Sequence, residues 1–199
     1  MAHIHRISPL GGRRPTRAEL PDFVDGPVDG ILGPEPRLLI VGINPGLWTA
    51  AVNAPFAHPG NRFWPSLHES GLTPRRVDAS AGLAEADEQM MHDQRIALTN
   101  LVNRATARAD QLDAEELRAG RARLTALVDQ VQPAVVAVSG ITAYRTAFEE
   151  RRAVLGRQPQ DLGSAELWVV PQPSGINAHA TMPVLVQWWQ QVGAAAGLL

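Results

Sequence analysis

Four short apolar runs, separated by segments with helical spacing, constrain the fold of this chain more than any other feature. They cover residues 38–41, 95–102, 134–140 and 167–171, and three of them run into Gly or Pro. Short runs of this kind, rich in Val, Ile and Leu, are typical of strands buried in a parallel sheet. The intervening helices would then cover both faces. We therefore expect an α/β fold: a three-layer sandwich with a central, mainly parallel four-stranded sheet and helices on both faces.

The length of the chain favours one domain. With 199 residues and 45% apolar content, it is long enough for one well-buried domain and short for two. Residues 1–34 mix Gly, Pro and Arg without apolar periodicity, so we expect them to form an irregular N-terminal arm. Residues 35–199 are expected to form the single domain. Its clearest helix begins at a capping box from Asp113 to Glu116.

Composition excludes several classes of site. Cysteine is absent, which excludes disulfides, thiolate nucleophiles and metal centres on Cys ligands. A net charge of −2 gives no overall attraction to nucleic acid, so any DNA binding depends on locally clustered arginines. No apolar run approaches the ~20 residues of a membrane span. We expect a soluble cytoplasmic protein, associated with the nucleoid if bacterial.

Three motifs mark the candidate site. The first strand leads into Gly-Ile-Asn-Pro-Gly at 42–46, the segment Pro-Phe-Ala-His-Pro-Gly-Asn-Arg-Phe-Trp follows at 55–64, and Pro-Gln-Pro-Ser-Gly-Ile-Asn follows the last strand at 171–177. Ligands of parallel α/β sheets bind at the carboxyl ends of the strands, so Asn44 lies where chemistry is expected. An Asn between Gly and Pro is often only a turn former. The two further motifs favour an active-site role.

The three motifs together resemble the mismatch-specific uracil/thymine DNA glycosylases, a branch of the uracil-DNA glycosylase superfamily. The resemblance covers residues 37–192. It implies a glycosylase domain that flips uracil, and also thymine or damaged pyrimidines in some members, out of duplex DNA. The enzyme then hydrolyses the N-glycosidic bond and leaves an abasic site for base excision repair. The implied partner is double-stranded DNA containing uracil or a mismatched or damaged pyrimidine, bound by a monomer without a cofactor or metal.

All 18 basic residues are arginines, and this composition bears on the reaction type. Glycosylases that also nick the strand commonly form a Schiff base through a lysine amine. A glycosylase with no lysine should therefore be monofunctional.

The resemblance assigns roles around the released base. In the family, the asparagine at the position of Asn44 holds the attacking water, and an amide suits this role because it both donates and accepts hydrogen bonds. Phe56 matches the residue that stacks on the flipped base. Backbone N–H groups of the first-motif loop and near Phe56 could stabilise the anionic leaving pyrimidine. The expected substrate contacts are Ile43, Gly46, Thr49, Phe56, Asn100 and Ser174.

The third motif is expected to enter the duplex. Its tip would place Ile176 as an apolar wedge in the space left by the flipped nucleotide. Gly175, Asn177 and Arg62 are the other expected DNA contacts. Two positions depart from the family pattern, since Gln172 stands where Asn is common and Ala178 where an Arg often reaches the opposite base. We therefore expect loose discrimination among opposite bases.

A second catalytic group is expected at Asp93, the carboxylate that precedes the second strand. It could activate water or stabilise the cationic sugar, and the alternative is an ordinary surface carboxylate in a charged stretch. His58 is expected to orient its loop rather than to act as an acid.

Two other function classes stay open. Ser174 could be a hydrolase nucleophile with His179 as base and Asp161 as orienting group, although the Gly-x-Ser-x-Gly elbow is absent. The chain could also be a non-catalytic nucleotide- or nucleic-acid-binding α/β domain, although no phosphate-loop pattern occurs. Incubation with uracil-containing DNA separates base release, ester cleavage and binding alone.

Overall fold

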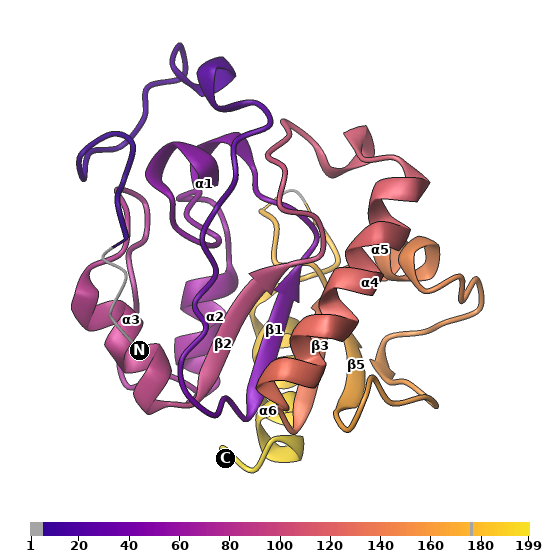
Figure 1. The fold of residues 1–199 in the computed structure, drawn as a ribbon. Helices are drawn as coiled ribbons and strands as arrows, with labels where there is room; N and C mark the ends of the chain where they lie inside the picture. The colour runs from indigo at the N-terminus through magenta and orange to yellow at the C-terminus, as the bar shows by residue number, and fades with distance from the viewer. Residues whose placement is uncertain (1–5, 176) are drawn as a thin grey trace.

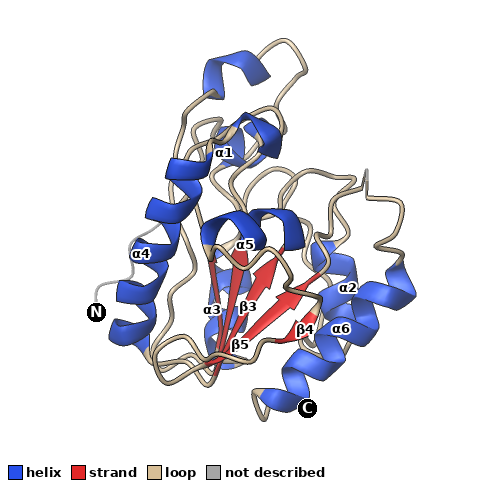
Figure 2. Ribbon diagram, turned by 90° about the vertical axis from the view of Figure 1, so that its right-hand side faces the viewer, coloured by secondary structure: helices blue, strands red, loops and turns tan. Residues whose placement is uncertain are grey.

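A computed structural model describes residues 6–175 and 177–199, which form the expected three-layer α/β sandwich (Figures 1 and 2). In this part of the chain the sheet has five strands in the order β2-β1-β3-β5-β4. The four expected strands are present and mutually parallel. The fifth, β4, pairs antiparallel with β5, and its two residues are too few to give an apolar pattern in the sequence. The strands are β1 (Leu38–Gly42), β2 (Ile96–Asn100), β3 (Val135–Ser139), β4 (Gly156–Arg157) and β5 (Glu166–Val170).

The central strands β1 and β3 are buried at every position. Successive side chains of a strand point to opposite faces of the sheet. Leu38 and Ile40 of β1 accordingly join one hydrophobic core, and Leu39 and Val41 join the other. A strand covered on both faces needs an apolar residue at every position, which explains the unbroken apolar runs in the sequence.

Helices cover the two faces unequally. The first core takes side chains from α2, α3 and α6, and the second takes side chains from α4 and α5. Figure 2 shows α4 and α6 on opposite sides of the sheet. The helices are α1 (Leu47–Val52), α2 (Phe63–Glu69), α3 (Glu85–Asp93), α4 (Ala114–Val131), α5 (Ile141–Ala147) and α6 (Met182–Ala195), with 3₁₀ turns η1 (Leu20–Phe23) and η2 (Ala109–Gln111).

The described part of the arm, residues 6–34, is irregular but packs on the sheet. Ile31 is 1% exposed and forms an antiparallel bridge with Leu98 of β2. The Arg6 side chain is 5% exposed, donates hydrogen bonds to three backbone carbonyls and pairs with Glu88 at 2.8 Å. Arg6 therefore fastens the arm to the fold and is not available to a phosphate.

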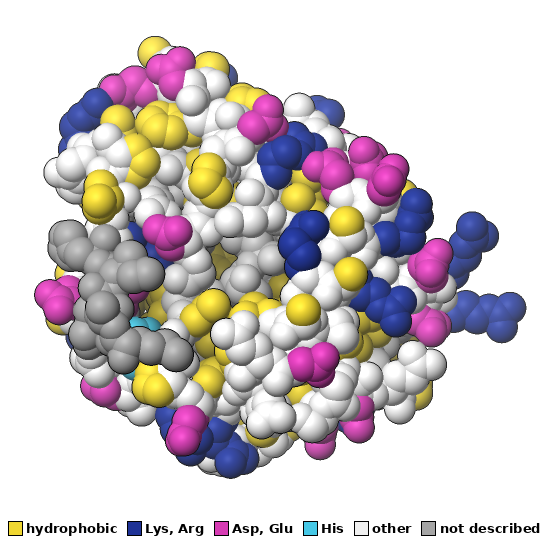
Figure 3. Space-filling model, viewed as in Figure 1, with side chains coloured by type: hydrophobic (Ala, Val, Ile, Leu, Met, Phe, Trp, Pro, Cys, Tyr) yellow, Lys and Arg dark blue, Asp and Glu magenta, His cyan; other side chains and the backbone are white. Residues whose placement is uncertain are grey.

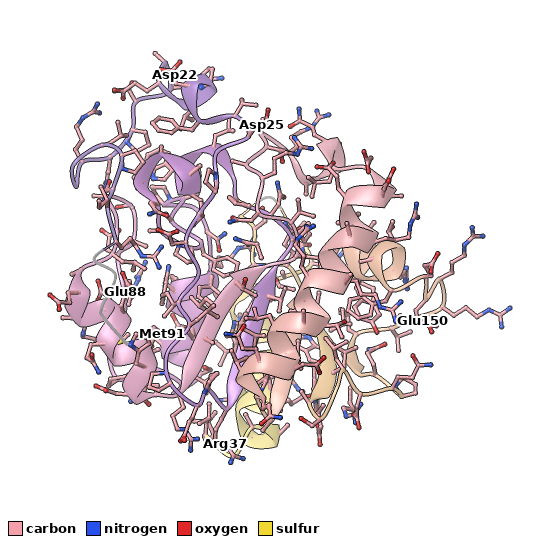
Figure 4. The ribbon with its side chains drawn as sticks, viewed as in Figure 1. Asp22, Asp25, Arg37, Glu88, Met91 and Glu150 are labelled. Atoms are coloured by element: carbon pink, nitrogen blue, oxygen red, sulfur yellow. The ribbon has the colours of Figure 1, made fainter. Side chains whose placement is uncertain are left out.

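The parallel strands of the sheet point toward α1 and the arm in Figure 1. In Figure 4, Asp25 of the arm lies at this end of the sheet and Arg37, just before β1, lies at the opposite end. Within residues 6–175 and 177–199, no helix is long and apolar enough to cross a membrane.

Candidate active site

The candidate site lies at the carboxyl ends of β1 and β2, where Gly42 and Asn100 are register partners. The ring of Phe56 lies beside Gly42. A Cβ atom on Gly42 would stand 2.5 Å from Asn100 Oδ1 and 3.4 Å from Phe56 Cζ. A side chain at this strand end would displace the Asn100 amide, so Gly42 leaves room for two of the predicted substrate contacts, Phe56 and Asn100.

Phe56 is the outermost ring of an aromatic stack. Its ring stacks on Phe63 with centroids 3.9 Å apart and planes 19° apart. Phe63 is fully buried and meets Trp64 and Trp189 edge-on. Phe56 has a φ of 55°, a conformation that costs about 1–3 kcal/mol for such a residue and persists only where the surroundings impose it. The buried stack supplies that constraint and leaves Phe56 half-buried at the surface of the site.

Asn44 follows β1, and three oxygen atoms fix its side-chain nitrogen. Nδ2 donates to Thr106 Oγ1 at 2.7 Å, to the Arg104 carbonyl at 2.9 Å and to the Pro45 carbonyl at 3.2 Å. Carbonyls only accept hydrogen bonds, so the atom that faces them must be the nitrogen. In the described part of the chain no donor bonds to Oδ1. Asn44 therefore offers a hydrogen-bond acceptor to the site.

The loop that holds Asn44 is itself anchored to α4. Thr106 Oγ1 donates to the Arg108 carbonyl at 2.8 Å, so the same oxygen must accept from Asn44. The Arg104 guanidinium pairs with Glu116 at 2.6 Å and with Asp25 at 2.8 Å. The hydrogen bonds that Arg104 donates to Glu116 and Asp25 raise the pKa of Arg104, and the hydrogen bond that Glu116 accepts from Arg104 lowers the pKa of Glu116.

Glu116 also closes the predicted capping box of α4. Its Oε2 accepts from the Asp113 N–H at 3.0 Å, and Asp113 Oδ1 accepts from the Glu116 N–H at 2.8 Å. The supporting residues Arg104 and Thr106 were not predicted, because nothing in their local sequence indicates that they face the first-motif loop. The one feature of the sequence that could have indicated them is their position shortly after β2, the strand beside β1.

Three further predicted contacts lie on or near the first-motif loop. Ile43 is buried, and a Cβ on Gly140 would stand 2.8 Å from its Cδ1. Gly46 is exposed at the start of α1 and bridges to Thr106. Thr49 is buried one turn further into α1. Ile43 and Gly46 thus flank Asn44, whereas Thr49 lies within the packed helix.

The third-motif loop, of which the structure describes residues 171–175 and 177–181, follows β5 at the carboxyl ends of the strands. Asn177 uses its side chain to shape this loop, since Nδ2 donates to the Gln172 carbonyl at 3.1 Å and Oδ1 accepts from the His179 N–H at 3.2 Å. Ser174 is half-buried in the loop. The predicted wedge, Ile176, lies outside the described residues.

The placement of Arg62 differs from the predicted DNA contact. Its guanidinium donates to the carbonyls of the third-motif loop: Ser174 at 3.0 Å, Gly175 at 2.8 Å, Asn177 at 3.0 Å, and Ala180. The side chain is therefore engaged inside the protein, because the loop turns its carbonyls toward it.

Asp93 does not lie in the site, which corrects the prediction of a second catalytic carboxylate. Asp93 ends α3 and precedes the amino end of β2, whereas Asn100 ends the same strand. Four strand steps of about 3.3 Å separate the two strand ends by roughly 13 Å. The Asp93 side chain is exposed and accepts from Gln89 Nε2 of its own helix at 2.8 Å.

His58 contacts residues of its own loop and of α1. His58 is exposed, its Nδ1 accepts from the Gly60 N–H at 3.0 Å, and its ring lies edge-on to Trp48 at 5.4 Å. These contacts orient its own loop.

The residues of the serine-hydrolase alternative are not joined. No hydrogen bond joins Ser174 to His179 among the described residues, and Asp161 pairs with Arg157. The described structure therefore assembles no serine-hydrolase triad.

Charges are mixed on the face shown in Figure 3, where acidic and basic side chains lie among one another. Many arginines are paired with carboxylates, including Arg6, Arg75 and Arg104. The described residues contain no group of three or more His, Asp or Glu side chains that could hold a metal ion.

Two comparisons with known proteins are informative. The sequence profile of the uracil DNA glycosylase superfamily matches residues 30–193. The fold is similar to the solution NMR structure of a candidate uracil DNA glycosylase from Methanosarcina acetivorans, with a TM-score of 0.58 and 16% sequence identity. The match covers 88% of this chain and 98% of that protein. At this identity the structural likeness shows a shared fold.

Proposed function

The chain belongs to the uracil DNA glycosylase superfamily, and from this membership we propose that it removes uracil from duplex DNA as a monofunctional enzyme of the mismatch-specific branch. The observation that carries the proposal is the approach of Phe56 and Asn100 to Gly42 at the carboxyl ends of β1 and β2, two residues before Asn44. This end of the sheet would supply an acceptor for water, an aromatic surface and an amide.

The proposed reaction breaks the bond between the sugar C1′ and the uracil nitrogen. A flipped uracil stacks on Phe56, and the amide of Asn100 beside it bonds to the edge of the base. Asn44 Oδ1 accepts a hydrogen bond from the attacking water and so directs the water oxygen toward C1′. The uracil leaves as an anion, which backbone N–H groups stabilise, and the water's surplus proton passes to solvent.

The first-motif loop, Ile43 to Trp48, supports this assignment because its main chain borders Asn44. Gly46 has no neighbour within 4 Å of where a Cβ would stand, so a ligand can approach the backbone closely. The absence of lysine supports a reaction that stops at the abasic site.

Substrate breadth is part of the proposal. We include thymine and damaged pyrimidines as further substrates beside uracil. Ala178 provides no long polar side chain toward the opposite base, so the opposite base should matter little. Duplex DNA is the proposed partner, bound by a monomer.

Incubation with uracil-containing oligonucleotides tests the function. The expected products are free uracil and an intact strand that breaks only after alkali. Strand nicking without alkali, with a covalent adduct trapped by borohydride, would contradict a monofunctional enzyme. Tight binding without base release would favour a non-catalytic DNA-binding domain. Duplexes carrying uracil or thymine opposite guanine, or uracil opposite adenine, then rank substrates and opposite bases.

A further inference from the structure

Arg62 joins two motifs that lie far apart in the sequence. It directly precedes Phe63, the buried ring under Phe56. Its backbone N–H donates to the Pro173 carbonyl at 2.9 Å. Its guanidinium donates to four more carbonyls of the third-motif loop, those of Ser174, Gly175, Asn177 and Ala180. Five carbonyls of one loop thus bond to a single residue.

Carbonyl oxygens that point at one place repel each other unless a cation or several donors lie between them. The arginine guanidinium supplies both a permanent charge and five N–H donors in a planar fork. Hydrogen bonds from a charged donor are also stronger than those between neutral groups. A lysine ammonium at this position would bring charge without the planar fork. The shape of the third-motif loop therefore depends on arginine specifically.

A second contact holds the same loop. A Cβ atom on Gly175 would stand 2.4 Å from the carbonyl oxygen of Gly60, so the two backbones touch. Gly175 is not among the glycines with positive φ. Close approach, rather than backbone conformation, requires a glycine there. The third-motif loop is therefore fastened to the second motif at two independent points.

We propose that Arg62 is a positioning residue that holds the third-motif loop in the shape in which it enters DNA, before DNA binds. The inference rests on the proposed function. A loop that is ordered beforehand loses little conformational entropy when it inserts into the base stack. Arg62 therefore assists the extrusion of the nucleotide and takes no part in the cleavage of the glycosidic bond.

The experiment compares single-turnover uracil release from duplex and single-stranded DNA. In Arg62→Ala, the rate of uracil release should fall about 10-fold or more on duplex DNA and at most about threefold on single-stranded DNA. The loss on the duplex is the size expected when hydrogen bonds from a charged group are removed. Arg62→Lys and Gly175→Ala should show the same selective loss. The matched control is Arg145→Ala, since this guanidinium also bonds a backbone carbonyl, that of Ala153, but in another loop.

Chemical rescue and a direct probe sharpen the test. Guanidinium chloride at about 10–50 mM, too dilute to unfold a protein, should restore part of the duplex rate of Arg62→Ala by filling the space among the carbonyls, and should leave the wild-type rate unchanged. A 2-aminopurine base beside the uracil should show slower extrusion in the variant. Amide hydrogen exchange across residues 172–181 should be faster in Arg62→Ala than in wild type or Arg145→Ala.

Several results would overturn the proposal: a wild-type duplex rate in Arg62→Ala, equal losses on both substrates, or unchanged exchange in the loop. If Arg62→Ala does not fold, Gly175→Ala and Arg62→Lys test the proposal instead. In both variants, the rate of uracil release on duplex DNA is again divided by the rate on single-stranded DNA. A wild-type protein that releases no uracil contradicts the proposed function instead. The exchange comparison still tests the role of Arg62 in that case.

Discussion

At the scale of single residues, the informative feature is the fixed orientation of one amide. Three acceptors surround Asn44 Nδ2, and Thr106 Oγ1 is the only side chain among them. Because Thr106 donates its own proton to the Arg108 carbonyl, it cannot also donate to Asn44. Thr106, like the two carbonyls, therefore helps to determine which end of the amide faces the site.

We expect Asn44→Ala to lower single-turnover base release by about 100-fold or more, because the water loses its acceptor. Binding to duplex DNA should persist, as measured by fluorescence anisotropy. Asp93→Ala is the matched control, since Asp93 lies near the amino end of β2, away from the site. This variant should keep the wild-type rate and thermal stability. A wild-type rate in Asn44→Ala would remove Asn44 from the mechanism.

Thr106→Val should lower the rate by about 10-fold, because the amide loses one of its fixed hydrogen bonds and can turn. Thr106→Ser keeps the hydroxyl and should retain most of the activity. Single-turnover kinetics with saturating enzyme distinguish the two variants. Equal rates in Val and Ser variants would show that the two carbonyls suffice to hold Asn44.

At the scale of elements, α4 supports the site from outside through Glu116. This residue caps its own helix and pairs with Arg104, whose carbonyl holds Asn44. The Arg104 guanidinium, and next the Asp113 N–H, lower the pKa of Glu116. A carboxylate with a lowered folded-state pKa stabilises the protein above its unfolded pKa of about 4.3, and this stabilisation disappears as the pH falls through the folded pKa.

We therefore expect Glu116→Gln to melt a few degrees below wild type at pH 7 and to approach the wild-type melting temperature as the pH falls below about 4. Differential scanning calorimetry from pH 7 to pH 3 measures the difference. Glu115→Gln, one position earlier on the same helix, is the control. A constant difference across this pH range would exclude the ion pair as its source.

The elements also show what the sequence determines. Short apolar runs predicted all four parallel strands, and the pattern is clearest in β1 and β3, which are buried at every position. The capping box at Asp113 predicted the start of α4 for an equally local reason. Asp93 was misplaced because its closeness to β2 in sequence does not tell which end of the strand it is near. Arg62 was misplaced because its partners lie beyond residue 170, out of reach of any local pattern.

At the scale of the whole molecule, the arm and the sheet form one packed unit. The arm was predicted to be irregular from its Gly and Pro content, and it contains a single 3₁₀ turn in residues 6–34. Arg6 and Ile31 are among the residues that attach it, and neither an isolated arginine nor an isolated isoleucine marks a contact in the sequence. The superfamily profile begins at residue 30, directly before this attachment.

The bridge between Ile31 and Leu98 occupies part of the outer edge of β2, with hydrogen bonds of 2.9 and 2.8 Å. At the other edge of the sheet, β4 is only two residues long and carries Arg157. Unpaired strand edges recruit further strands from other molecules, and a short charged strand resists this.

A variant that begins at residue 35 lacks Ile31 and should therefore self-associate, so that its light scattering rises with protein concentration. Arg6→Ala keeps the bridge and should stay monodisperse. A truncated protein that stays monomeric would contradict this. On this prediction, the arm keeps part of the β2 edge from pairing with a strand of another molecule.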